Sequence, residues 1–206
     1  MSRVAEMAVG TALDAAVGPA TYGPGMTQPT ANREYPGPRE RRDPPWVAAE
    51  RPMLEAWLDF HRATLRWKCE GLTGEQLATR SVPPSSLSLL GLVRHLTEVE
   101  RSWFSRTLAG RDAPPLYYDD ENPDGDFDDL DPARAEDALV AYDAEVATSR
   151  EVVTAYDSLD AIGAVMRHGE HNVSLRWIYV HMIEEYARHN GHADLLREAI
   201  DGTTGD

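Results

Sequence analysis

Glu185 and His189 are the residues of this sequence whose types and spacing most clearly suggest chemistry. They lie four positions apart in WIYVHMIEEYARHNGHADLLRE (residues 177–198), where apolar residues recur with a helical period. On a helical projection, Met182 and Leu196 fall within about 40° of His189, as Glu185 does, so the pair should face a hydrophobic core. A buried carboxylate without a partner is costly, and two side chains at i and i+4 can ligate one metal ion. The pair therefore predicts either a metal site or a polar cluster within the core.

A third ligand can come from GLVRHLTEVERSWF (residues 91–104), a second segment with a helical period. His95 lies at the edge of the apolar face of this segment, from where its imidazole can turn inward. Two imidazoles and one carboxylate would form an open divalent-metal site with room for water or substrate. The alternative is a polar cluster in which Glu185, His189 and a neighbouring arginine satisfy one another, and spacing alone does not decide between the two.

Four segments with helical periodicity position these residues, and they span about 47–71, 86–109, 132–156 and 174–200. The residues expected to begin or end them are Ser85 or Ser86, Gly110, Asp131, Pro132 and Gly202. No segment alternates as a strand would, so we expect an all-α protein with a four-helix bundle over residues 46–206. Residues 1–45 are rich in proline and lack any period, which predicts a disordered or extended tail. Met26 within it is a candidate for the true translation start.

Composition restricts the classes of partner. The formal net charge is −15 and no stripe of arginine or lysine is present, which disfavours binding to nucleic acid or an anionic membrane. No apolar run is long enough to span a bilayer, and the N-terminus does not have the pattern of a signal peptide, so we expect a cytoplasmic protein. The single cysteine, Cys69, excludes an intrachain disulfide and is expected to be a small buried residue rather than a nucleophile.

An acidic stretch, YYDDENPDGDFDDLD, separates the second and third predicted helices at residues 117–131. Its carboxylates do not follow the ligand spacing of an EF-hand calcium loop, and Pro123 would interrupt such a loop. We therefore expect a solvated acidic crossover loop rather than a calcium site.

The blocks SLLGLVRHLTEVERSWF and RWIYVHMIEEYARHNGHADLLREAIDG together resemble the DinB-like superfamily, and the resemblance covers about residues 50–202. The superfamily includes a mostly actinobacterial branch of unknown function and the mycothiol-dependent maleylpyruvate isomerases. The resemblance implies a four-helix bundle that holds a divalent metal through His95, Glu185 and His189. Many relatives have histidine at the position of Glu185. The glutamate makes this chain closer to the isomerase-like pattern and lowers the positive charge of the site.

Several further polar residues flank this predicted site. His192 and Glu98 are candidates for orienting a ligand histidine or for transferring a proton. Arg176, His61 and His181 are candidates for contacting substrate, although a core or surface role is the alternative for each. His168 and His171 lie in the loop before the last helix, where they could gate the pocket.

The resemblance implies a metal-dependent enzyme that activates a low-molecular-weight thiol, such as mycothiol or bacillithiol, for S-transfer or for isomerisation of a small substrate. Zinc is the first candidate metal, and nickel, iron or manganese would also accept these ligands. The alternatives are a non-catalytic metal- or ligand-binding or stress-response bundle and a metal-dependent hydrolase with Glu98 or His192 as base. We also expect that the protein can form a homodimer through its helix faces.

Overall fold

The computed structural model describes residues 41–166 and 169–205 of the chain. The described residues are mostly helical and contain no strand, which confirms the predicted all-α class; an isolated β-bridge pairs Ile162 with Ser174. None of the helices in these residues combines the length and hydropathy needed to span a bilayer. The predicted tail lies almost entirely outside the described residues, and its described part, residues 41–45, contains no helix.

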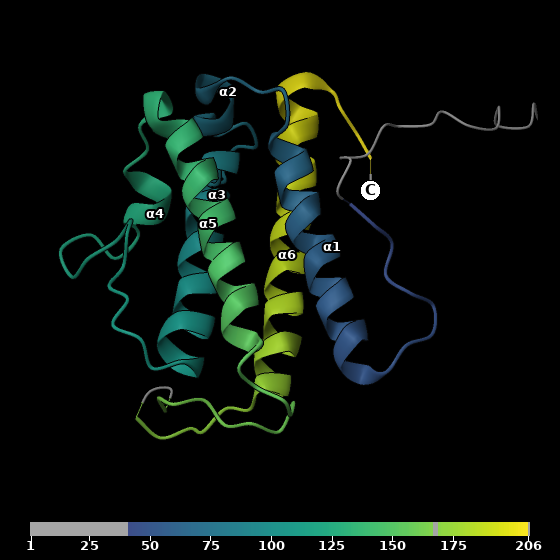
Figure 1. Cartoon of the computed structure of the whole chain (residues 1–206). Helices are drawn as coiled ribbons and strands as arrows, with labels where there is room; N and C mark the ends of the chain where they lie inside the picture. The colour runs from purple at the N-terminus through teal and green to yellow at the C-terminus, as the bar shows by residue number, and fades with distance from the viewer. Residues whose placement is uncertain (1–40, 167–168, 206) are drawn as a thin grey trace, which may run out of the picture. The chain divides into compact units, whose positions relative to one another are not determined.

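Four long helical segments run side by side (Figure 1). They are α1 (Glu50–Cys69), α3 (Leu89–Glu100) with its continuation η1 (Arg101–Leu108), α5 (Ala135–Val153) and α6 (Leu175–Asp201). Helix α6 packs against both α1 and α3, and α3 also packs against α5. The segment η1 is a π-helix, in which the backbone of α3 continues with a wider turn.

Local capping chemistry explains where the long helices begin and end. The hydroxyl of Ser88 accepts a hydrogen bond from the backbone N–H of Gly91, and Ser174 caps α6 through Trp177 in the same way. Helix α6 ends at Gly202, whose φ of 76° is a left-handed conformation that glycine adopts without strain. The predicted end at Gly202 is therefore confirmed.

The predicted start of the second helix is wrong by about three residues. Neither Ser85 nor Ser86 caps α3, because the hydroxyl of Ser85 accepts a hydrogen bond from the N–H of Leu87 within the preceding turn. Asp131 does accept from the N–H of Ala133, as predicted, but it caps the short 3-10 segment η2 (Pro132–Arg134) that leads into α5.

Two short helices were not predicted. Helix α2 (Gly74–Ala78) begins with a capping box between Thr73 and Gln76, and α4 (Gly125–Asp128) lies inside the acidic crossover. Both are too short to show a hydrophobic period. Helix α4 packs against α3, so part of the predicted solvated loop belongs to the folded core.

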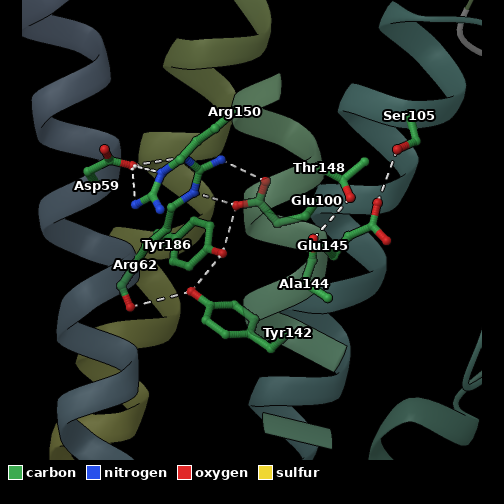
Figure 2. A network of polar contacts seen from close by, with 10 residues as sticks. All are labelled: Asp59, Arg62, Glu100, Ser105, Tyr142, Ala144, Glu145, Thr148, Arg150 and Tyr186. Carbon is green, nitrogen blue, oxygen red and sulfur yellow. Dashed lines mark hydrogen bonds and ion pairs between the residues drawn. The ribbon is translucent and has the colours of Figure 1, made fainter. Parts of the chain in front are cut away.

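The core between the long helices is largely apolar, and it contains a hydrogen-bonded polar network, which Figure 2 shows. Arg62 on α1 makes two hydrogen bonds of 2.7 Å to the carboxylate of Glu100 on α3, which is fully buried. The hydroxyl of Tyr186 on α6 donates to the same carboxylate at 2.8 Å, and Tyr142 on α5 lies 3.0 Å from that hydroxyl. The ion pair and the two tyrosine hydroxyls thus connect all four long helical segments.

Candidate functional site

His95, Glu185 and His189 come together at the packing interface of α3 and α6. Each offers one ligand atom, and these three atoms lie within 4.8 Å of one another. The side chains of Glu185 and His189 are 14 % and 11 % exposed and that of His95 is 23 % exposed, so the group is largely shielded from solvent. We call these three residues the triad.

The distances within the triad suit ligation better than hydrogen bonding. Oε1 of Glu185 lies 3.5 Å from Nε2 of His95 and 3.6 Å from Nε2 of His189. Two ligand atoms bound at zinc-like distances in a tetrahedral site stand about 3.4 Å apart. Hydrogen bonds between such groups are shorter, with a usual range of roughly 2.7–3.2 Å. The residues present therefore fit a divalent metal bound through two imidazoles and one carboxylate.

The environment of His189 keeps its imidazole neutral. Burial lowers the pKa of His189 to about 4, and the neighbouring His95 contributes in the same direction. A neutral imidazole has the free lone pair that a metal ligand requires. At neutral pH, His189 is therefore in the protonation state that can bind a cation.

Both histidines of the triad have a partner on the ring nitrogen that faces away from Glu185. Nδ1 of His95 lies 2.8 Å from a carboxylate oxygen of Asp126 in α4, and Nδ1 of His189 lies 3.4 Å from Nδ1 of His192. These contacts leave Nε2 of each ring directed toward Glu185. His192 therefore lies where a residue that orients His189 is expected.

Asp126 is a residue that the sequence analysis placed in a solvated loop, and that prediction is wrong for this side chain. Asp126 is only 5 % exposed and contacts a histidine 31 positions earlier in the chain. Nothing in the acidic stretch distinguishes it from its acidic neighbours, because no helical or strand period extends across the loop. Only the path of the crossover brings it to His95.

The triad lies within a segment that matches a known family. The family model described as mycothiol-S-transferase matches residues 53–202. The chain belongs to this family. It is a DinB-like family, so the predicted membership of that superfamily is confirmed. None of the curated proteins compared with the chain matches it.

An aromatic group lies next to the triad in this member of the mycothiol-S-transferase family. The ring of His181 stacks on Trp177 at 5.1 Å between centroids and lies 4.5 Å from the ring of Trp103. A ligand atom of His181 also lies within 4.8 Å of Glu184 and Glu185. Glu184 is about half exposed and pairs with Arg188, however, so we do not assign a second metal position to this group.

Glu98 faces the crossover loop in this family member. One of its oxygens accepts hydrogen bonds from the backbone N–H groups of Leu116 and Tyr117, and the side chain is buried. These contacts hold the loop after η1 against α3. They do not favour the predicted role of Glu98 in proton transfer or in orienting His95, whose Nδ1 is taken by Asp126.

Arg176 is held by two carboxylates at the beginning of α6. It pairs with Glu50 and with Asp160, and these two partners neutralise the charge that was expected to bind an anionic ligand. Arg176 also precedes Glu185 by nine residues, which is about 13 Å along a helix. Its predicted contact with substrate at the triad is therefore not favoured.

The remaining predicted histidines lie apart from the triad contacts. His61 on α1 packs against Trp57 and Phe60, and the side-chain amide of Asn190 donates to its backbone carbonyl. Burial lowers the pKa of His61. His171 is exposed in the loop before α6, and His168 lies outside the described residues.

Proposed function

We propose that this protein is a divalent-metal-dependent enzyme that activates a low-molecular-weight thiol of the mycothiol type for S-transfer or for isomerisation of a small substrate. Membership of the mycothiol-S-transferase family supports the thiol and the transfer. The observation that carries the metal is the spacing of 3.5 and 3.6 Å between Glu185 and the two histidines. Zinc is the first candidate, and nickel, iron or manganese accept the same donors.

The roles of the residues follow from their positions. His95, Glu185 and His189 would hold the ion, and three protein ligands leave a coordination position for an exogenous ligand. A bound divalent ion lowers the pKa of a thiol that ligates it, so that the thiolate forms near neutral pH. His192 would orient His189 through the contact between their Nδ1 atoms.

The aromatic group formed by Trp103, Trp177 and His181 suits a small, partly apolar substrate. Trp177 is 47 % exposed although it stacks on His181, so a face or an edge of its indole is accessible to a ligand. His181 would then contact substrate rather than metal. A reduced thiol as co-substrate is also consistent with the expected cytoplasmic location and with a protein that has one buried cysteine. The homodimer stays a prediction.

The test compares metal content and thiol conjugation in the wild type and in His189→Ala. Protein purified without an affinity tag should contain about one divalent ion per chain by elemental analysis. With mycothiol and 1-chloro-2,4-dinitrobenzene, the variant should lose conjugation by about 100-fold or more, because metal activation contributes several kcal/mol. His171→Ala, which changes an exposed loop histidine, is the matched control and should behave as the wild type.

A wild type that binds no divalent ion would overturn the metal site. A wild type that binds metal but conjugates no thiol would instead favour the non-catalytic alternative, a metal- or ligand-binding protein. The two results therefore test the metal site and the enzymatic activity separately.

A further inference from the structure

The short helix α4 is held tightly against α3 at the point where α3 carries His95. A Cβ atom on Gly91 of α3 would lie 3.1 Å from the ring of Phe127, and one on Gly125 of α4 would lie 2.5 Å from the backbone oxygen of Tyr117. Arg94, next to His95 in the chain, donates hydrogen bonds to the backbone oxygens of Gly125 and Asp129. These contacts hold both ends of α4.

Two successive residues of α4 contact the imidazole of His95 from different directions. Asp126 meets its edge, with 2.8 Å between a carboxylate oxygen and Nδ1. Phe127 covers its face, with 4.8 Å between ring centroids and 29° between ring planes. The side chain of Asp126 is only 8 % exposed, so water competes little for this contact. The contact with Asp126 restricts rotation of the His95 ring within its plane, and the contact with Phe127 restricts the tilt of the ring.

We propose that Asp126 is a positioning residue that selects the tautomer of His95 and aims its Nε2 at the metal position. An ionised carboxylate only accepts hydrogen bonds, so Nδ1 of His95 must be the nitrogen that carries the proton. The lone pair is then on Nε2, which lies 3.5 Å from the oxygen of Glu185. The role of Asp126 in metal binding rests on the proposed function. Its effect on the tautomer of His95 does not.

The first measurement needs no metal. Long-range ¹H–¹⁵N NMR spectra of the metal-free protein report which nitrogen of each histidine is protonated, and His95→Gln identifies the signal of His95. The wild type should show His95 protonated on Nδ1 at neutral pH. Asp126→Asn should give a mixture or the Nε2–H form, because an amide can either accept from Nδ1 or donate to it.

The second measurement is the affinity for Zn²⁺, determined by competition with a chromogenic chelator. Asp126→Asn should bind Zn²⁺ about 10- to 100-fold more weakly than the wild type, the usual effect of removing a carboxylate that orients a ligand histidine. Asp128→Asn is the matched control on the same short helix. Asp128 is exposed and pairs with Arg80, so the control should bind Zn²⁺ as the wild type does.

The outcomes distinguish this proposal from the proposed function. An Nε2–H tautomer in the wild type, or a folded Asp126→Asn with wild-type tautomer and Zn²⁺ affinity, would overturn the positioning role. If the wild type bound no Zn²⁺, the metal-dependent function would fail, and the tautomer spectra of wild type and Asp126→Asn would decide the role of Asp126 by themselves. Unfolding in urea checks that both variants are folded.

Discussion

At the scale of single residues, the interatomic distances in the triad distinguish a metal site from a hydrogen-bonded polar cluster. Glu185 lies on the apolar face of α6, where an isolated carboxylate would be costly. Its oxygen stands 3.5 Å or more from both imidazoles, and the contact with Arg188 is longer still, at 3.9 Å. A polar cluster that satisfied itself would contract to hydrogen-bond distances, so the separation favours a cation among these three side chains.

Cys69 gives a prediction at this scale that does not depend on the metal. It is a buried residue at the end of α1, and burial raises the pKa of its thiol to about 12. The native protein should therefore resist alkylation by iodoacetamide at pH 8 and react promptly once unfolded in urea. Rapid alkylation of the folded protein would contradict the expected buried, unreactive thiol.

The raised pKa of Cys69 also makes the stability of the protein depend on pH in the alkaline range. Because burial raises the pKa of Cys69 in the folded state from its ordinary value of 9.0 to about 12, its stabilising effect is complete below pH 9 and is lost as the pH rises toward 12. Between pH 8 and pH 10, the wild type should lose about 1 kcal/mol more free energy of unfolding than Cys69→Ala. Urea unfolding at the two pH values measures the difference.

At the scale of elements, long helices were predictable and short ones were not. The period of α6 predicted both its extent and the shared face of Glu185 and His189, because helix geometry is local. Helices α2 and α4 have five and four residues, too few to repeat any pattern. Helix α4 nevertheless carries Asp126, so a contact of the site depends on an element that has no local signal.

Substitutions at two glycines test how closely the helices around the site are packed. Gly191 lies within α6, two residues after His189, and no atom of the described residues outside the local helix lies within 4 Å of a Cβ atom placed there. Gly191→Ala should raise the free energy of unfolding by about 0.5–1 kcal/mol, since alanine favours a helix, and should leave Zn²⁺ affinity unchanged.

Gly125→Ala should behave in the opposite way. The added methyl group would meet the backbone oxygen of Tyr117 at 2.5 Å, so α4 must shift. The variant should lose about 1–3 kcal/mol of stability and bind Zn²⁺ more weakly, because Asp126 moves with α4. Urea unfolding and chelator competition measure the two effects, and an unchanged Zn²⁺ affinity would show that α4 is not tightly held.

At the scale of the whole molecule, a buried ion pair and two tyrosine hydroxyls join the four long helical segments. Figure 2 shows Arg62 and Tyr186 converging on Glu100, with Tyr142 beside them. Burial acts to lower the pKa of Arg62, but the carboxylate of Glu100 outweighs it and the pKa is raised, so the guanidinium stays charged. We expect an ion pair satisfied in this way to specify how the helices align rather than to add stability, because a well-packed apolar pair could be equally stable.

The prediction at this scale concerns breaking the ion pair from one side. Arg62→Met leaves the fully buried Glu100 without its charged partner and should cost about 3–5 kcal/mol in the free energy of unfolding. The double variant Arg62→Met with Glu100→Leu should recover most of that loss, because no unpaired charge is then buried at this position. Arg134→Ala, which breaks an exposed pair with Asp137, is the control and should show no measurable change.

The sequence by itself determined the helical class, the main helix faces and the i, i+4 pair of Glu185 and His189. These features follow from hydrogen bonding and side-chain spacing along one stretch of chain, so a local pattern records them. Only the tertiary structure decided that Asp126 meets His95, that Glu98 holds a loop and that Arg176 is neutralised at the surface. Those contacts join residues through loops and between helices, and their distances depend on the path of the backbone rather than on any periodicity.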